Sequence, residues 1–284
     1  MTPDISVLIL TLNEERNLEA CLRAVSWSDD VVVFDSFSTD RTVEIAKDCG
    51  ARVIQRHFDN ERSHRAASLQ VPFKHSWVFN PDADEIATEE LSLEMLSAVA
   101  TSGRDAAAFR MRRKDMFMGL WIRHSSLYPT WFARLFRPDK IRFERTINLN
   151  CIVDGPELRL EQHLLHYSFN KGLDEWLTKH NKYSRAEAFE SLQSLKNSPL
   201  NWHNVILGDP LQRRRALKEV SFRVPFRPLA RFLYMYVARK GFMDGIPGFH
   251  FCCLVSFYEY MICLKMRELQ GNVTEPAKLT HVST

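Results

Sequence analysis

Carboxylate side chains follow two apolar runs in this sequence, at the points where buried strands are expected to end. Asp82 and Asp84 come just after the run 77–79, and Asp35 ends the run 30–35. Two carboxylates in a D-x-D pair can hold one Mg²⁺ or Mn²⁺, which takes oxygen ligands and bridges to diphosphate oxygens. A D-x-D pair also occurs by chance in many proteins, so its place in the fold decides its meaning.

The acidic stretch 79–90 continues beyond the D-x-D pair with residues that are typical of the start of a helix. Thr88, Glu89 and Glu90 fit the cap and the acidic first turn of a helix. Glu85 stands between the two parts, and we assign it to the surroundings of the D-x-D pair.

The first hundred residues alternate apolar runs of strand length with amphipathic helical stretches. We predict strands over 5–10, 30–35, 51–56 and 76–82, with helices over 13–25, 38–50 and 62–71 between them. This rhythm predicts an α/β fold with a mainly parallel sheet flanked by helices. Ligands of such sheets bind beyond the carboxyl ends of the strands, where the carboxylates stand. Asn13 is expected to cap the first helix and Gly50 to end the second.

The rest of the chain has a different rhythm. We predict a strand over 106–119, a hairpin over 131–145 and a short strand over 163–169, in which His166 is expected to be structural. From Gly172 the pattern is helical to the end. A soft boundary falls near 165–175, and we do not expect it to separate independently folding units.

Composition excludes several classes of protein. The 284 residues carry a net charge of only +3, so we expect no nucleic-acid partner. There is no G-x-G-x-x-G after the first strand and no P-loop motif. The six cysteines form no C-x-x-C pair, which fits a reducing cytoplasm. The N-terminus lacks the basic region of a signal peptide.

The C-terminal region combines basic charge with apolar helices. Residues 210–240 hold nine Lys or Arg against one acid, Glu219. Such a segment suits an anionic lipid surface or an anionic substrate, and a solvated helix face is the alternative. We interpret the apolar run 249–264, which contains His250 and Glu259, as a core or interfacial helix and not as a membrane span.

Three stretches resemble the signature of family-2 glycosyltransferases with the GT-A fold. They are "SVLILTLNEERNLEACLRAV", "VVVFDSFSTDRTVEIAKDCGARVI" and "WVFNPDADE". Further on, "GLWIRHSSLYPTWFARLFR", "LLHYSF" and "EWLTKHNKYSRAEA" are similar to a subgroup that includes the lipopolysaccharide inner-core β-1,4-glucosyltransferases. The resemblance covers most of the chain to about residue 268.

The resemblance implies donor-binding roles for matching positions. The loop 11–14, with Thr11, Asn13 and Glu14, matches the loop that contacts the nucleotide. Asp35 matches the aspartate that holds the uracil or ribose; by itself it would fit a helix-capping turn. Arg65 lies where relatives carry a basic residue near the diphosphate, and a solvated helix residue is the alternative.

The D-x-D pair and the acceptor side complete the set of roles. The resemblance makes Asp82 and Asp84 metal ligands for Mg²⁺ or Mn²⁺, with Asp82 also on the donor and Asp84 counted as catalytic. On the acceptor side we select Arg123, His124 and Tyr128, beside aromatic residues that otherwise fit a hairpin core.

One departure from the family concerns the general base. Where many relatives have a His-Glu or Asn-Glu pair, this chain has Asn148-Leu149. A leucine cannot take the proton from an acceptor hydroxyl. Glu144 and Asp154 are our candidates for this role, with Asp115 and His124 as further possibilities.

These observations predict an inverting, metal-dependent enzyme that moves glucose from UDP-glucose to a lipopolysaccharide core or related lipid-linked glycan. Residues 1–170 would form the catalytic domain, with the nucleotide-sugar half over 1–100 and the acceptor half over 101–170. Residues 171–284 would form a helical region attached peripherally to the inner face of the cytoplasmic membrane, which makes the protein cytoplasmic. The alternatives are a polyprenyl-phosphate glycosyltransferase and a catalytically silent homologue that binds nucleotides or glycans.

Overall fold

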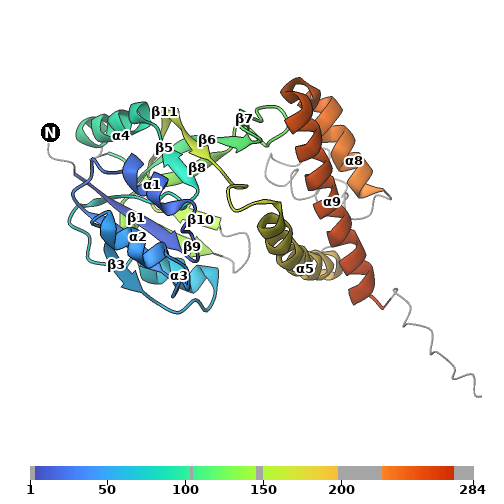
Figure 1. The fold of residues 1–284 in the computed structure, drawn as a ribbon, viewed down its shortest axis with the longest axis horizontal. Coiled ribbons are helices and arrows are strands. Elements are labelled where there is room, and N and C mark those ends of the chain that lie inside the picture. Colours follow the sequence, from blue (N-terminus) through green and yellow to red (C-terminus); the bar gives the residue numbers. More distant parts are fainter. Residues whose placement is uncertain (1–3, 103–104, 145–149, 198–225, 272–284) are drawn as a thin grey trace, which may run out of the picture. The chain divides into compact units, whose positions relative to one another are not determined.

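The computed structural model describes residues 4–102, 105–144, 150–197 and 226–271. The chain divides into two compact units, residues 1–171 and 172–284 (Figure 1). The first unit is built on a mixed sheet and the second is helical.

The first four strands form the predicted parallel half of the sheet. Their order is β3-β2-β1-β4, and each neighbouring pair is parallel. The strands are β1 (Ile5–Thr11), β2 (Val31–Asp35), β3 (Arg52–Gln55) and β4 (Trp77–Phe79). The helices between them are α1 (Leu18–Ala24), α2 (Thr42–Asp48) and α3 (Glu61–Ser68). The βαβ rhythm of the sequence is thus confirmed.

Beyond β4 the sheet becomes mixed, in the order β4-β8-β6-β11-β5. These strands are β5 (Glu85–Ala87), β6 (Ala108–Phe117), β8 (Trp131–Phe136) and β11 (Glu157–His166), and β7 (Leu120–Trp121) folds back on β6. Of the contacts among them, β6–β11 is parallel, and β4–β8, β6–β8 and β5–β11 are antiparallel. The helix α4 (Glu89–Ser102) follows β5.

The predicted hairpin over 131–145 is wrong. Its first half is β8, whose two edges are taken by β4 and β6. Its second half is β9 (Ile141–Glu144), which pairs with β10 (Asn150–Val153) in a separate ladder. A short turn of 3₁₀-helix, η1 (Pro138–Lys140), separates them. Since β8 has no free edge, β9 must find another partner.

Apolar side chains cover both faces of the sheet, which explains the continuous apolar runs in the sequence. On one face Ile5, Val7 and Ile9 of β1 pack with residues of α1, α2 and α4. On the other face Leu8 packs with residues that follow α3 and with the β9–β10 ladder. The layers hold the strand ends in fixed positions.

The two predicted helix ends have different outcomes. Gly50 follows α2 with a φ of 77°, and its N–H donates to the carbonyl of Lys47, as expected for a helix end. Asn13, however, does not cap α1, whose N-cap is Asn17. Asn13 has a φ of 55° and bonds to the loop after β2 instead, because the chain must turn sharply where β1 ends.

Within residues 172–197 and 226–271, the described part of the second unit, there are two long helices and a shorter one. They are α5 (Leu173–Asn197), α8 (Arg227–Leu233) and α9 (Gly245–Leu269). A π-helical turn, η2 (Tyr234–Ala238), and a 3₁₀ turn, η3 (Gly241–Asp244), connect α8 to α9. Ala188 of α5 packs with Ile262 and Met266 of α9. By length and composition, the helical stretch Gly241–Leu269 could cross a membrane.

Candidate active site

The predicted polar residues meet at the carboxyl edge of the parallel strands. Thr11 and Asp35 are paired in the register of β1 and β2, and Leu10 forms a parallel bridge with Asp82. Asn80, at the end of β4, donates from its side chain to the carbonyl of Leu8 at 2.6 Å. This bond ties the acidic stretch to β1, so that its carboxylates lie beside the loops that follow β1 and β2.

Asp82 is held by two arginines that come from distant parts of the chain. Arg65 of α3 donates to one carboxylate oxygen at 3.2 Å, and Arg134 of β8 donates to the other. Burial alone would raise the pKa of Asp82, but the two guanidinium groups outweigh it and hold the pKa well below its usual range. Both oxygens of Asp82 therefore already face cations.

Glu85 lies at the centre of this charged network. It is 1% exposed, accepts from Arg134 at 2.8 Å, and lies 3.5 Å from the guanidinium of Arg113. Its other oxygen accepts the backbone N–H of Asp82 at 3.0 Å. Glu85 thus shapes the turn that carries the D-x-D pair, as expected for a residue beside the ligands.

Asp84 faces a histidine. Its carboxylate lies 3.4 Å from Nε2 of His166, at the end of β11. The other ring nitrogen of His166 bonds to Asp115 of β6 at 2.7 Å. Burial alone would lower the pKa of His166, but the bonds to Asp115 and Asp84 raise it to about 9. The expectation that His166 is merely structural does not explain its place beside the D-x-D pair.

The residues around Asp84 fit a divalent metal shared with a substrate. In the described part of the chain, no group of three or more His, Cys, Asp or Glu side chains is arranged to hold a metal. Mg²⁺, however, is usually bound by one or two protein ligands together with waters and substrate phosphates. Asp84 supplies one such oxygen ligand, and His166 could join it only as a neutral imidazole, after loss of the proton that its raised pKa retains at neutral pH. Because both oxygens of Asp82 bond to arginines, the geometry favours Asp84 as the ligand.

Side-chain bonds join the loops after β1 and β2. Asp35 is fully buried and accepts hydrogen bonds from Thr11 at 2.9 Å and Gln55 at 3.0 Å. It also accepts the backbone N–H of Ser38. Burial alone would raise the pKa of Asp35, but these donors lower it, so the carboxylate stays charged. Asn13 accepts the backbone N–H of Thr39 at 2.8 Å, which closes the two loops against each other.

Glu14 has a partner that is 157 residues away in the sequence. Its carboxylate bonds to the ammonium of Lys171 at 2.5 Å and to the side chain of Asn17 at 2.9 Å. Burial raises the pKa of Glu14, and the bonds to Lys171 and Asn17 oppose this effect only in part. Lys171 therefore anchors the predicted nucleotide loop to the end of the first unit.

The predicted acceptor residues lie on the segment that follows β7. Tyr128 bonds to His163 of β11 at 2.9 Å and packs edge-on against Trp121. The guanidinium of Arg123 lies 5.5 Å from the same Trp121 ring. His124 lies in this segment, half-buried.

This segment adjoins the residues around His166. The backbone N–H of Ile122 donates to the carbonyl of Asp115 at 3.0 Å, and Asp115 bonds to His166. Asp115 of β6 therefore connects the aromatic and basic segment to His166 and, through it, to Asp84.

The two candidates for the general base lie at opposite ends of the β9–β10 ladder. Glu144 is paired with Asn150 at one end, next to Phe143, whose ring lies 5.9 Å from the Arg65 guanidinium. Asp154 follows the other end, where Pro156 accepts the N–H of Ala107 just before β6 begins. Neighbouring side chains of a strand point to opposite faces, so Glu144 points away from the face on which Phe143 meets Arg65, and it pairs with Arg142 at 3.4 Å instead. These contacts favour neither candidate over the other. Leu149 and Asn148 lie outside the described residues.

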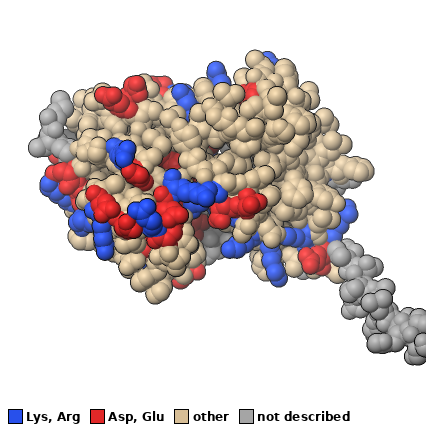
Figure 2. All heavy atoms as spheres, viewed as in Figure 1, with Lys and Arg blue, Asp and Glu red and all other residues tan. Residues whose placement is uncertain are grey.

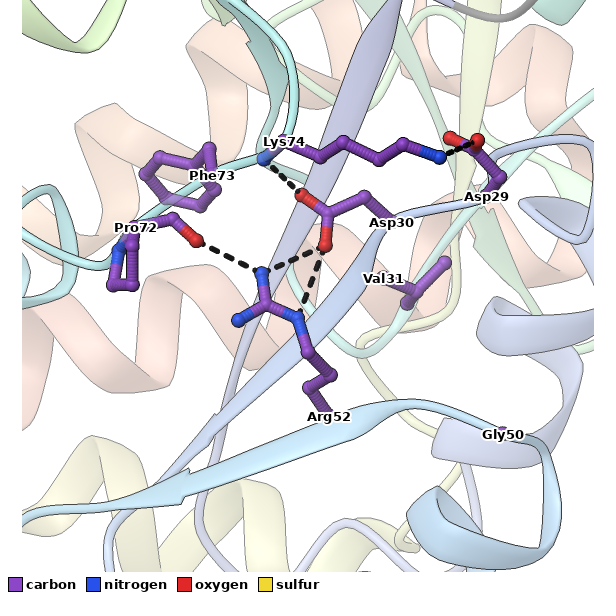
Figure 3. A pocket seen from close by; sticks show the side chains of 8 residues that line it. All are labelled: Asp29, Asp30, Val31, Gly50, Arg52, Pro72, Phe73 and Lys74. Atoms are coloured by element: carbon purple, nitrogen blue, oxygen red, sulfur yellow. Dashed lines mark hydrogen bonds and ion pairs between the residues drawn. The ribbon is translucent and has the colours of Figure 1, made fainter.

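A hollow of about 370 Å³ lies at the opposite edge of the sheet (Figure 3). Arg52 bridges Asp30 and the carbonyl of Pro72 there, and Lys74 pairs with Asp29. These charged groups satisfy one another at the amino ends of β2 and β3. The hollow is therefore separate from the site that the carboxylates define.

Comparison with known proteins establishes the family. The model of glycosyl transferase family 2 matches residues 6–156. The chain belongs to this family and is a glycosyltransferase with the GT-A fold that the sequence predicted.

Individual relatives are distant. An uncharacterized glycosyltransferase of Rickettsia bellii is 26% identical, over 95% of this chain and 88% of its own. The lipopolysaccharide core biosynthesis glycosyltransferase LpsC of Rhizobium meliloti is 22% identical, over 96% of this chain and 95% of its own. A solved structure of glucosyl-3-phosphoglycerate synthase from Mycobacterium tuberculosis, in complex with Mn²⁺, UDP-glucose and phosphoglyceric acid, is 25% identical, with a TM-score of 0.34, over 39% of this chain and 44% of that one.

Sequence reasoning placed none of Arg134, Lys171 and His166 in this network: it considered Arg134 only as a contact for acceptor phosphates and His166 only as structural. The basic character of "WFARLFR" was visible, but its pattern does not tell which arginine turns inward. Arg134 is only 8% exposed, and an arginine is rarely buried to this extent unless it is paired, as Arg134 is with Glu85. A charged residue alternating with apolar ones in a central strand was the available signal.

Proposed function

We propose that this glycosyltransferase moves glucose, with inversion, from UDP-glucose to a lipid-linked glycan of the lipopolysaccharide core type. The observation that carries the proposal is the carboxyl edge, where Asp84 and His166 lie beside the arginine-bound Asp82. This arrangement offers ligands for a divalent metal and cations for a diphosphate. The sugar and the acceptor follow from the resemblance to the inner-core glucosyltransferases.

In the proposed reaction, the loops after β1 and β2 bind the nucleoside. Asp35 accepts hydrogen bonds from the uracil or the ribose in place of its present donors, and Asn13 keeps the two loops closed. Arg65 and Arg134 present their guanidinium groups to the diphosphate region, where charge-assisted bonds are strongest. These contacts hold the donor with its anomeric carbon toward the acceptor side.

Asp84 would hold Mg²⁺ or Mn²⁺, and His166 would join it as a ligand once its ring has released a proton. When bound, the metal supplies positive charge for the departing nucleoside diphosphate. Asp115 fixes the ring of His166 by its bond to Nδ1 and thus positions Nε2 toward Asp84. The three residues come from β6, β11 and the turn before β5.

The transfer is a single in-line displacement. A hydroxyl oxygen of the acceptor forms a bond to the anomeric carbon while the bond from that carbon to the diphosphate oxygen breaks. Glu144 or Asp154, the two candidate bases that the sequence offers, takes the proton of the hydroxyl. Arg123, His124 and Tyr128 receive the acceptor.

A polyprenyl-phosphate acceptor is a second candidate. The apolar stretch Gly241–Leu269 favours it, because a membrane-embedded acceptor demands an enzyme that reaches the lipid phase. For both acceptors we place the protein in the cytoplasm, on the inner face of the cytoplasmic membrane.

A donor screen tests the proposal. Purified protein is mixed with a panel of nucleotide sugars and Mn²⁺, and release of the nucleoside diphosphate is measured with and without core lipopolysaccharide or polyprenyl phosphate. We expect UDP-glucose to be hydrolysed slowly alone and faster with the core glycan. UDP binding without hydrolysis or transfer of any donor would instead identify a catalytically silent homologue.

A further inference from the structure

Helices α8 and α9 form a closed hairpin in the second unit (Figure 1). Arg227 of α8 pairs with Glu259 of α9 at 2.6 Å, with 13% and 15% of the two side chains exposed. Toward the turn, Phe249 packs against Phe232 and Tyr236. The hairpin therefore has an ion pair toward its open end and an aromatic cluster toward its turn.

The turn of this hairpin exposes large apolar side chains to an unusual degree. We define the hairpin tip as the residues Val237, Phe242, Met243 and Ile246. They are 55%, 51%, 59% and 70% exposed, respectively. Phe249, in the first turns of α9, is 42% exposed although it also packs inward. Contiguous exposed apolar residues of this kind are typical of an interaction surface.

The basic charge around the hairpin tip indicates which kind of partner would bind to it. Between residues 226 and 258 the chain carries four cations and a single acid, Asp244. The cations are Arg227, Arg231, Arg239 and Lys240. Apolar side chains flanked by basic ones are complementary to an anionic lipid surface, whereas a second copy would bring the same cations together. In Figure 2, which has the same view as Figure 1, the part of the surface over α8 and α9 is largely tan, with few Lys, Arg, Asp or Glu side chains.

The length of the apolar part limits how far the hairpin can enter. From Gly245 to Tyr258, α9 has no Asp, Glu, Lys or Arg, and Glu259 follows. Fourteen helical residues span ~21 Å. The hydrocarbon core is about 30 Å thick, and apolar helices of this length are typical of interfacial or re-entrant segments.

The other end of α9 is held by polar contacts. The ammonium of Lys265 bonds to the carbonyl and side chain of Asn181, both at 2.6 Å, and to Ser184 at 2.7 Å. These partners lie on α5, a helix rich in charged residues. Crossing the bilayer with this end would require the polar contacts to leave water, so the tip is the end that enters.

We infer that the α8–α9 hairpin inserts its tip into one leaflet of an anionic membrane, without crossing it. Phe242, Met243 and Ile246 enter the acyl region, and Arg239 and Lys240 contact the lipid phosphates. The inference deepens the proposed function, on whose membrane-linked acceptor it rests, because it assigns the attachment to a particular segment and depth.

Flotation with lipid vesicles tests the inference on the full chain. The wild type, the variant Phe242→Glu/Ile246→Glu and the control Leu93→Glu are each mixed with vesicles of phosphatidylcholine with or without phosphatidylglycerol. Leu93 is an equally exposed apolar residue (61%) on α4 of the first unit. We expect the wild type and the control to float with the anionic vesicles, and the double variant to lose about 100-fold in partitioning. A wild type that stays at the bottom, or a double variant that floats equally well, overturns the inference.

Insertion depth is measured separately with Met243→Trp and brominated lipids confined to one leaflet. Quenching by the outer leaflet alone supports insertion into one leaflet. No quenching, or quenching by the inner leaflet, overturns it. If Ile246→Glu turns a dimer into a monomer without affecting flotation, the tip is instead a contact between copies.

Donor hydrolysis in detergent separates the two hypotheses. A protein that hydrolyses UDP-glucose but does not float overturns only the hairpin inference. A protein that floats but hydrolyses no donor overturns only the proposed function.

Discussion

The carboxyl edge of the first unit and the α8–α9 hairpin of the second differ in the side chains that they gather: charged ones at the edge and large apolar ones on the surface of the hairpin. At the edge, four carboxylates, three arginines and His166 form a network of ion pairs that includes Arg134, Glu85 and Asp84. In the hairpin one ion pair is enclosed while large apolar side chains face outward. The edge therefore offers charged groups to a small ligand, whereas the hairpin offers apolar side chains, which we propose enter a lipid layer.

The two units also differ in how many large apolar residues they expose to solvent. The 46 described residues from 226 to 271 include thirteen large hydrophobic residues that are exposed, against eight in the whole described part of the first unit. A soluble surface normally scatters such residues singly. The hairpin therefore needs a partner for its surface, whereas the first unit needs one only at its edge.

The largest effect on stability is expected from Arg134→Met. This change leaves Asp82 and Glu85 without their shared cation, and breaking a buried pair by removing one partner costs about 3–5 kcal/mol. Urea unfolding followed by tryptophan fluorescence measures the loss. The control Arg23→Met removes an exposed helix pair with Glu19 and should change the unfolding free energy by less than about 0.5 kcal/mol. Equal losses in the two variants would mean that the edge is no more tightly coupled than the surface.

The second effect concerns catalysis at the same edge. Asp84→Asn should reduce donor hydrolysis by about 100-fold or more, because it removes the carboxylate that would hold the metal, whose positive charge would stabilise the departing diphosphate. Asp29→Asn, at the opposite edge of the sheet, is the matched control and should leave the rate unchanged. Full activity of Asp84→Asn, measured as release of the nucleoside diphosphate, would remove the metal role from the D-x-D pair.

A smaller effect is expected at the anchor of the nucleotide loop. Lys171→Met frees Glu14, so we expect KM for the donor to rise about ten-fold, which corresponds to ~1.4 kcal/mol, with a smaller change in kcat. Lys171→Arg should restore part of the loss. Lys74→Met removes an ion pair at the opposite edge and serves as the control. A drop in kcat alone would show that Lys171 acts on the chemical step and not on the loop.

The smallest effect concerns acid stability. The pKa of Asp35 is lower in the folded protein than in the unfolded chain, where it is about 4. Its contribution to the free energy of unfolding is therefore fully present above the unfolded pKa and is lost as the pH falls through the folded pKa. The unfolding free energy should therefore decrease below about pH 4. Asp35→Asn should flatten this part of the pH profile at a cost of about 1 kcal/mol at neutral pH. A profile identical to that of the wild type would show that other carboxylates dominate acid unfolding.

The parallel half of the fold could be predicted because its signals are local. Strands β1, β2 and β4 are apolar runs, the helices between them have their own periodicity, and the alternation of these elements predicts that Asp35 and Asp82 lie at the carboxyl edge of the sheet, as they do. The β8–β9 hairpin was predicted wrongly because two nearby strand-like runs look the same whether or not they pair. Pairing depends on which edges remain free, and this is a property of the whole sheet.

By itself, the sequence determined the family, the parallel half of the sheet and the place of the D-x-D pair. Only the tertiary structure decided which charges meet: Arg134 reaches Asp82 across 52 residues, and Lys171 reaches Glu14 across 157. Such pairs depend on strand order and register, which no local pattern encodes. The same reason explains the hairpin tip, since an apolar run becomes a surface only when no other element packs over it.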